Sequence, residues 1–253
     1  MGRRVIFLLL MLGCAPTERG TRAVSEEVLS NGGQQDTLDY VERLTGGALA
    51  NERLPLVVAV HGLGDRPEHF ARVFDGWTVK ARVVLPAGPV RWGDGHAWMT
   101  VRSAESERMS ELAAQTRDSA DRIAAWIKVV SRRHPTQGKP IVTGFSQGGM
   151  LSYALATHHG DVIAAAVPVS GFLPNPLYPS NGRVLAPVYG LHGGSDDVLS
   201  VEWAQNTVKH LQEVGGEASL QVYPGVPHRV SPTMRVDWFQ TLERVALKEH
   251  DLQ

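Results

Sequence analysis

Five short, mostly apolar runs recur along the chain, and several of them end in a turn rich in glycine or proline. They lie at residues 56–60, 82–86, 141–142, 162–169 and 187–192. A run that is apolar throughout, rather than alternating with polar residues, is typical of a strand buried on both faces of a parallel sheet. Two intervening stretches, 107–133 and 202–214, have apolar positions at helical spacing. The pattern predicts an α/β fold with a mostly parallel central sheet flanked by helices.

The first and last elements of this domain are predicted from weaker patterns. Residues 37–45 alternate enough to predict an edge strand, whereas 218–223 and 232–247 predict a last strand and a final helix. The proline-rich stretch 174–181 predicts a loop and not an inserted lid domain. We therefore expect one lidless domain over residues 37–253.

The N-terminus has the pattern of an export signal. Arg3 and Arg4 precede an uncharged apolar run, 5–12, which is too short to span a bilayer. The ending at Gly13 and Cys14 resembles a bacterial lipoprotein signal, in which the cysteine is acylated and becomes the first residue. A plain secretory signal or an uncleaved apolar segment remains the alternative. The expected arrangement is a signal peptide over 1–13, lipidation at Cys14 and an exported, membrane-anchored protein on the periplasmic or cell-surface side.

Residues 14–36 are polar and lack apolar periodicity, which predicts a flexible tether. The remaining composition excludes other classes. With 25 Lys and Arg against 26 Asp and Glu, the net charge of −1 gives no support to nucleic-acid binding. The ten histidines show no strong metal-ligand spacing, and His158 and His159 read as a polar helix end. We therefore expect no metal and no cofactor.

Residues 144–148 (GFSQG) have the spacing of a nucleophile elbow, which is a sharp turn between a strand and a helix with a serine at its apex. Such a turn is so tight that a Cβ two residues before or after Ser146 would collide with the backbone. A helix N-terminus there would also favour a developing anion. The five-residue pattern alone fits an ordinary glycine-rich turn as well, so its context has to decide.

That context places three further groups at the carboxyl ends of predicted strands, where ligands bind in open α/β sheets. The glycine-rich loop 61–65 is where a first oxyanion-hole N–H is needed. Asp196 and Asp197 follow the strand at 187–192, and His228 lies on the loop after the last strand. The order Ser146, Asp196, His228 is that of α/β-hydrolases. Ser170 lacks a glycine two residues before it and is rejected as a rival nucleophile.

Seven segments together resemble the phospholipase/carboxylesterase family, which includes acyl-protein thioesterases. They are HGLGD at 61–65, PAGPVR at 86–91, AW at 97–98, GFSQGG at 144–149, SGFLP at 170–174, HGGSD at 192–196 and PH at 227–228. The resemblance runs from about residue 55 to the end and implies a compact α/β-hydrolase fold. It implies the backbone N–H groups of Leu63 and Gln147 as the oxyanion hole. It also selects Asp196, the fifth residue of its motif, over Asp197.

Substrate contacts are the least determined part of the sequence. Trp98 lies in a loop near a strand end, where an aromatic side chain can form a substrate wall or belong to the core. We assign Trp98, Phe172 and Leu173 to the substrate pocket. Met99 and Thr100 depart from the family pattern, which often has an aromatic residue followed by Asp after this tryptophan.

The expected activity is that of a serine carboxylic-ester hydrolase acting on small-molecule esters with short to medium acyl groups. Ser146 would be the nucleophile, His228 the base and Asp196 the residue that orients it. A peptidase or a polyester depolymerase would use the same groups. A tethered, non-catalytic binding protein on the same scaffold is the alternative from another class.

Overall fold

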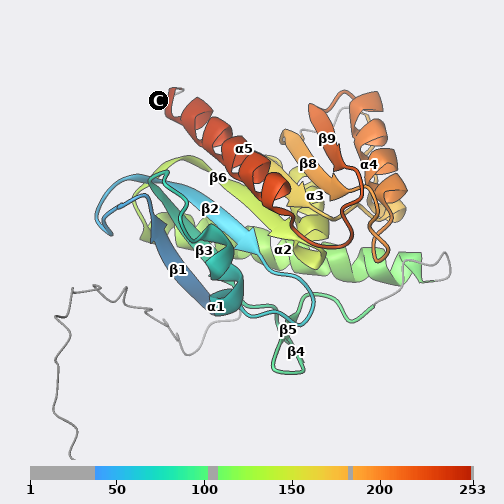
Figure 1. Ribbon diagram of the computed structural model, residues 1–253, viewed down its shortest axis with the longest axis horizontal. Helices are drawn as coiled ribbons and strands as arrows, with labels where there is room; N and C mark the ends of the chain where they lie inside the picture. Colours follow the sequence, from blue (N-terminus) through green and yellow to red (C-terminus); the bar gives the residue numbers. More distant parts are fainter. Residues whose placement is uncertain (1–37, 102–107, 182–184, 252–253) are drawn as a thin grey trace, which may run out of the picture.

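The computed structural model describes residues 38–101, 108–181 and 185–251. A seven-stranded sheet with the order β1-β3-β2-β6-β7-β8-β9 forms the centre of the protein (Figure 1). The strands are β1 (Tyr40–Thr45), β2 (Leu54–Val60), β3 (Ala81–Pro86), β6 (Thr136–Phe145), β7 (Ala165–Val169), β8 (Val188–Gly193) and β9 (Ala218–Tyr223). Neighbouring strands are parallel except at the edge, where β1 pairs antiparallel with β3. The predicted mostly parallel sheet is confirmed.

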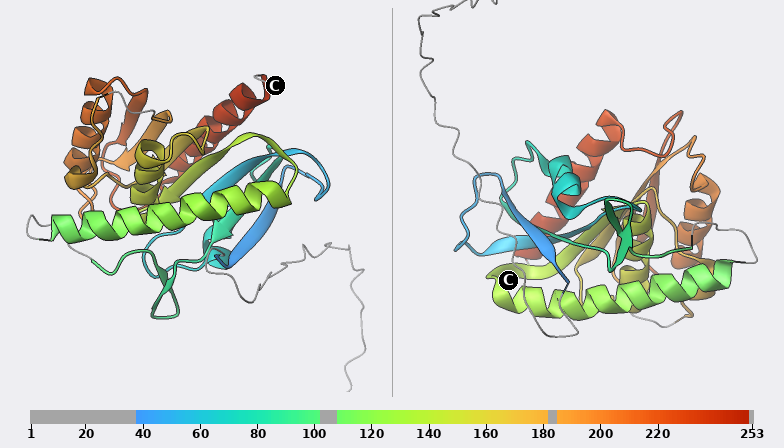
Figure 2. Two further views of the ribbon diagram at one scale, coloured as in Figure 1. Left: turned by 180° about the vertical axis from the view of Figure 1, so that it is seen from behind. Right: turned by 90° about the horizontal axis from the view of Figure 1, so that it is seen from below.

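Helices cover both faces of this sheet (Figure 2). They are α1 (Pro67–Phe70), α2 (Met109–Arg133), α3 (Gln147–His158), α4 (Val201–Glu213) and α5 (Pro232–Asp251), with 3-10 turns at Ala71–Phe74 and Asn175–Leu177. The long helix α2 runs along one face, which α3 and α4 also cover, while α1 and α5 pack against the other. A small hairpin, β4 (Val90–Trp92) and β5 (Gly95–Ala97), stands apart from the main sheet.

The central strand β2 shows why its sequence is apolar throughout. Leu56, Val58 and Val60 belong to the core under α2 and α3, whereas Val57 and Ala59 belong to the core under α5. Successive side chains of a strand point to opposite faces, so a strand covered on both sides needs apolar residues at every position.

The final helix is fixed directly to the strand that carries Ser146. Trp238 is fully buried, and its indole N–H donates a hydrogen bond of 2.7 Å to the hydroxyl of Thr143 in β6. That hydroxyl donates in turn to the carbonyl of Val167 in β7, at 2.6 Å. The predicted final helix is therefore present, and it extends beyond residue 247.

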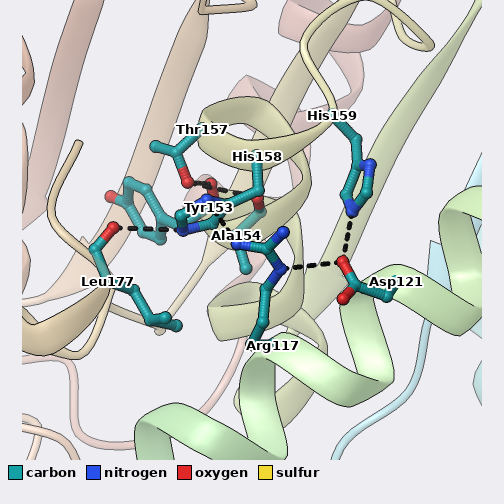
Figure 3. A network of polar contacts seen from close by, with 8 residues as sticks. All are labelled: Arg117, Asp121, Tyr153, Ala154, Thr157, His158, His159 and Leu177. Carbon is teal, nitrogen blue, oxygen red and sulfur yellow. Dashed lines mark hydrogen bonds and ion pairs between the residues drawn. The ribbon is translucent and has the colours of Figure 1, made fainter. Parts of the chain in front are cut away.

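Helix α3, which begins directly after Ser146, is fastened at its far end to α2 (Figure 3). Asp121 of α2 accepts hydrogen bonds from Arg117 at 2.8 Å and from His159 at 2.6 Å. Arg117 also lies 3.1 Å from Nδ1 of His158, whose Nε2 donates to the carbonyl of Leu177. These contacts agree with the polar helix end expected at His158 and His159, and they connect that end of α3 to α2.

The sequence did not predict the hairpin or the short helix α1, and β6 begins earlier than expected. The segment between β7 and β8 contains only a 3-10 turn in its described part, consistent with the absence of a lid there. The predicted signal peptide, Cys14 and the tether lie outside the described residues. None of the described helices combines the length and hydrophobicity needed to cross a membrane.

Candidate active site

Ser146 occupies a strained turn between β6 and α3. Its φ of 58° and ψ of −115° are unusual for a residue with a side chain. A Cβ added to Gly144 would lie 2.5 Å from the carbonyl oxygen of Val60, and one added to Gly148 would lie 1.9 Å from it. Both glycines are thus required by close packing against β2, as the elbow pattern predicts. This geometry distinguishes the turn from an ordinary glycine-rich connection.

The structure brings Ser146, His228 and Asp196 into one hydrogen-bonded chain. The hydroxyl of Ser146 lies 2.9 Å from Nε2 of His228, and Nδ1 of His228 lies 2.7 Å from Oδ2 of Asp196. The ring of Phe145 packs against the imidazole at a centroid distance of 4.8 Å. A serine beside a histidine that is itself oriented by a carboxylate can act as a nucleophile with its own base.

Asp196, and not the exposed Asp197, is the acid that reaches His228. Its other oxygen, Oδ1, accepts hydrogen bonds from the backbone N–H groups of Val198 at 3.0 Å and Leu199 at 2.8 Å. Nε2 of His192 lies 3.3 Å from Oδ2. The carboxylate is therefore held on both oxygens.

These contacts also determine the charge of Asp196. Burial by itself raises the pKa of this carboxyl group, but hydrogen bonds from His192, His228 and the Leu199 N–H outweigh burial and hold the pKa well below its usual range. At neutral pH the group is an anion, which is the form that stabilises an imidazolium on His228.

Two backbone N–H groups are available beside Ser146. Gly62 packs against it, since a Cβ on Gly62 would lie 3.3 Å from the Cβ of Ser146. The next residue, Leu63, lines the same cleft as Ser146, and Gln147 is the first residue of α3. Within the described residues, neither the Leu63 N–H nor the Gln147 N–H donates a hydrogen bond. Within the described chain, both predicted oxyanion donors therefore remain available to a bound molecule.

A cleft of about 600 Å³ opens over Ser146 and His228. Leu63, Phe145 and Val198 give part of its lining an apolar character. The residues that supply its charged and ionisable groups are Asp65, Arg66, His69 and Asp94. Among these, His69 Nδ1 lies 2.7 Å from Asp65 Oδ1. The lining of the cleft therefore includes both apolar and ionisable side chains.

The three residues assigned to the substrate pocket do not line this cleft. Trp98 is 3% exposed and packs against His61, with ring centroids 5.5 Å apart, so its placement is that of a core residue. Phe172 and Leu173 line a separate, mostly apolar pocket of about 360 Å³, together with Met109, Tyr178 and Trp203. The sequence could not separate these placements because each depends on contacts with distant elements.

The contacts of three polar side chains around the site were not anticipated. His61 is hydrogen bonded to Gly62 and Gly88, and His192 contacts Asp196. The side-chain amide of Gln147 is bonded to the backbone of Trp98 and Met99. Both histidines precede a glycine at the carboxyl end of a buried strand, which is a visible signal, but nothing local indicates their partners. No group of three His, Cys, Asp or Glu residues in the described chain is placed to hold a metal ion.

A family model described as phospholipase/carboxylesterase matches residues 49–243. Acyl-protein thioesterase 1 homolog 1 of Dictyostelium discoideum is 26% identical over 191 residues, covering 70% of this chain and 84% of that protein. A putative carboxymethylenebutenolidase of Salmonella typhimurium is 25% identical over 195 residues, covering 72% of this chain and 70% of that protein. An uncharacterized secreted protein of Arthroderma benhamiae is 25% identical over 227 residues, which span 76% of this chain but 23% of that protein.

Solved structures give the same fold. The crystal structure of esterase PE8 has a TM-score of 0.69 at 22% identity and covers 80% of this chain and 99% of its own. The crystal structure of the Bacillus cereus carboxylesterase has a TM-score of 0.66 at 12% identity, with coverages of 83% and 96%. Together with the family match, these likenesses establish the α/β-hydrolase fold.

Proposed function

The chain belongs to the phospholipase/carboxylesterase family, and from that premise we propose that it is a serine carboxylic-ester hydrolase. The observation that carries the proposal is the hydrogen-bonded chain from Ser146 through His228 to Asp196, which opens onto a cleft. Relatives named as thioesterases and a structure named as an esterase support the same reaction class.

The proposed reaction begins when Oγ of Ser146 attacks the ester carbonyl while Nε2 of His228 takes the hydroxyl proton. The imidazolium formed is stabilised by the anionic Asp196. His228 then gives the proton to the departing alcohol, leaving an acyl group on Ser146. A water molecule, deprotonated by His228, releases the acid and restores the serine.

The Leu63 and Gln147 N–H groups would bind the oxyanion that forms in both steps. A donor of this kind is worth ~10²–10³ in kcat. Two features support the assignment: both groups lie beside Ser146, and neither donates a hydrogen bond within the described chain. Gln147 adds the partial positive charge of the α3 N-terminus.

We propose soluble esters with short to medium acyl groups as substrates. The cleft is open, and part of its lining is ionic, unlike the apolar groove that a long-chain lipase keeps under a lid. The measurement is turnover across p-nitrophenyl esters of increasing chain length. Faster turnover of an emulsified long-chain triglyceride than of a soluble butyrate or hexanoate ester would contradict this range.

Active-site labelling tests the reaction class itself. A fluorophosphonate should label the wild-type protein once, at Ser146, and should not label Ser146→Ala. The same variant should keep its fold, because in the described part of the chain Oγ is hydrogen bonded only to His228, and it should lose ester hydrolysis to background. An unlabelled wild-type protein that binds esters without cleaving them would instead establish the binding-protein alternative.

For its location, we propose an exported protein anchored to a membrane through Cys14. The support is the basic and apolar N-terminus ending in Gly13 and Cys14, and the name of one distant relative, which is described as secreted. Cys14 is the only cysteine, so any thioether-linked lipid must be attached there. Radiolabelled palmitate should enter the wild-type protein in a bacterial host and be absent from Cys14→Ala. A wild-type protein that takes up no label and fractionates as soluble would refute the anchor.

A further inference from the structure

His61 is a fully buried histidine that the proposed reaction does not use. It lies directly after β2, at the start of the loop that carries Leu63. Both ring nitrogens have backbone partners: Nδ1 lies 2.7 Å from the carbonyl oxygen of Gly62, and Nε2 lies 3.0 Å from the backbone nitrogen of Gly88. An imidazole with two such partners is held in one orientation.

The partners also determine which nitrogen carries the proton. A backbone N–H can only donate, so Nε2 of His61 must accept from Gly88. The ring proton is therefore on Nδ1, which donates to the carbonyl of Gly62. Burial lowers the pKa of His61, although the hydrogen bond to Gly62 partly opposes this, so the ring stays neutral and keeps this arrangement.

The carbonyl that His61 holds belongs to the same peptide group as the N–H of Leu63. A trans peptide is planar, and its C=O and N–H point in opposite directions. Fixing the oxygen of Gly62 on the buried side therefore fixes the hydrogen of Leu63 on the other side. A donor to the oxygen also polarises the peptide and strengthens its N–H as a donor.

This peptide needs such a restraint because it lies in a glycine-rich loop. Gly62 precedes it and Gly64, with a φ of 77°, follows Leu63. Glycine adopts many backbone conformations, so rotation of the peptide has little steric resistance. Rotation would turn a carbonyl, rather than an N–H, toward the place where the negative charge develops.

The surroundings hold His61 in turn. Trp98 packs against its ring, and the backbone N–H of Trp98 donates to the side-chain oxygen of Gln147 at 2.9 Å. On the other side of the loop, Gly64 and Asp65 exchange backbone hydrogen bonds of 2.8 and 2.9 Å with His96 of β5. His96 also donates through Nδ1 to the carbonyl of Gly88, at 2.7 Å. The residue is thus part of a connected network of hydrogen bonds and ring contacts.

We propose that His61 is a positioning residue for the hydrolase reaction: its Nδ1–H fixes the Gly62–Leu63 peptide so that the Leu63 N–H meets the oxyanion. The proposal rests on the proposed function, since it assigns a role to the oxyanion donor of that reaction. His61 does not touch substrate, and its effect is confined to the orientation and strength of one N–H group.

A matched pair of substitutions separates the two hydrogen bonds. In His61→Asn, the amide nitrogen stands where Nδ1 stood and can still donate to Gly62. In His61→Gln, the amide oxygen stands near the former Nε2 and can accept from Gly88. The imidazole donor to the carbonyl of Gly62 is lost, which leaves that oxygen with only the longer bond of 3.3 Å from the Asp65 N–H. Both variants replace the ring by an amide, and Asn is the smaller by one methylene group. Any loss of packing against Trp98 is therefore larger in His61→Asn, which is the variant expected to keep its activity.

With a soluble p-nitrophenyl ester, His61→Gln should lose ~10²–10³ in kcat with little change in KM, which is the effect of losing one oxyanion donor. His61→Asn should retain most of the wild-type kcat. The affinity for a trifluoromethyl ketone, whose adduct carries the oxyanion, should fall with kcat in the Gln variant. Equal losses in both variants, following their melting temperatures, would show that His61 serves packing alone and would overturn the proposal.

A measurement on the wild-type protein tests the proposal even if the variants fold poorly. The ¹⁵N resonances of the His61 ring should show a neutral ring protonated at Nδ1 across the pH range of activity. An Nε2-protonated ring would refute the positioning role. If the wild-type protein neither hydrolyses esters nor reacts with fluorophosphonate, the proposed function itself fails, whereas a fully active His61→Gln would refute only the role of His61.

Discussion

Ser146, the proposed nucleophile, and His228, its proposed base, are held in place by different forces. Around Ser146, backbone packs on backbone: Cβ atoms added to Gly148 and Gly149 would lie 1.9 and 2.6 Å from carbonyl oxygens of β2 and β7. Around His228, the nearby Gly225 has open space beside it, and hydrogen bonds to Asp196 and Ser146 hold the ring. The backbone before His228 is closely packed as well, since a Cβ added to Gly193 would lie 2.3 Å from the carbonyl oxygen of Val226, but the imidazole ring itself is placed by these hydrogen bonds and by the ring of Phe145. The serine and the histidine ring should therefore respond to different changes.

Gly148→Ala should have the largest effect on stability, because it adds a methyl group to the closely packed elbow around Ser146. The new methyl group would overlap the carbonyl of Val60, and neither backbone can move without shifting β2 or α3. We expect a loss of about 3 kcal/mol or more in the free energy of unfolding, together with loss of activity. Urea unfolding followed by circular dichroism measures it, and a variant of wild-type stability would show that the elbow is loosely packed.

Asp196→Asn tests the polar region and should leave packing nearly unchanged. By analogy with the same change in a serine protease, we expect kcat to fall by about 10⁴ because the amide favours the wrong tautomer of His228. The matched control is Asp197→Asn, since Asp197 is exposed and does not contact His228. If the control loses the activity and Asp196→Asn keeps it, the acid has been assigned to the wrong residue.

Lowering the pH should weaken the contacts of the Asp196 carboxylate and so reduce the stability of the fold. The pKa of Asp196 is lower in the folded state than its unfolded value of about 3.9, so the carboxylate stabilises the fold above that value. This contribution is lost as the pH falls below about 4 toward the folded-state pKa. In urea unfolding at a series of pH values, the stability difference between wild type and Asp196→Asn should be largest above about pH 5 and should shrink toward pH 2. A difference independent of pH would contradict the charged contact.

Gly225→Ala should give the smallest effect and completes the comparison with Gly148→Ala. The added methyl group meets no atom within 4 Å, so only the φ of 71° opposes it. We expect a loss of about 1 kcal/mol, or a fall of roughly 2–4 °C in melting temperature for a domain of this size. A loss as large as that of Gly148→Ala would show that the turn at Gly225 is packed as closely as the elbow.

The same contrast explains which parts of the structure could be predicted from the sequence and which could not. Strands such as β2 were predicted because burial on both faces leaves a continuous apolar run in the sequence. The hairpin β4–β5 was not, because its strands have three residues each and one of them, β5, is held by backbone bonds from His96 to Gly64 and Asp65, far away in sequence. Ser146 was predicted because its steric requirement leaves glycines at fixed spacing.

Residues positioned by polar contacts are harder to place from sequence. Trp98 was assigned to the substrate pocket, but its contacts with His61 and Gln147 put it in the core. No spacing of residues encodes those partners. The roles of Asp196 over Asp197 and of the Leu63 N–H came from the family resemblance, because two adjacent carboxyl groups on a loop cannot be distinguished by periodicity.

The hydrogen bond from Trp238 to Thr143 has a consequence for synthesis of the chain. At ~5–20 residues per second, Trp238 is added roughly 5 to 18 s after Ser146. During that interval the nascent polypeptide carries Ser146 without the helix that covers one face of β6, and for most of it without His228. The apolar face under α5 stays uncovered until the last part of translation, and transiently exposed hydrophobic surface of this kind is what chaperones bind.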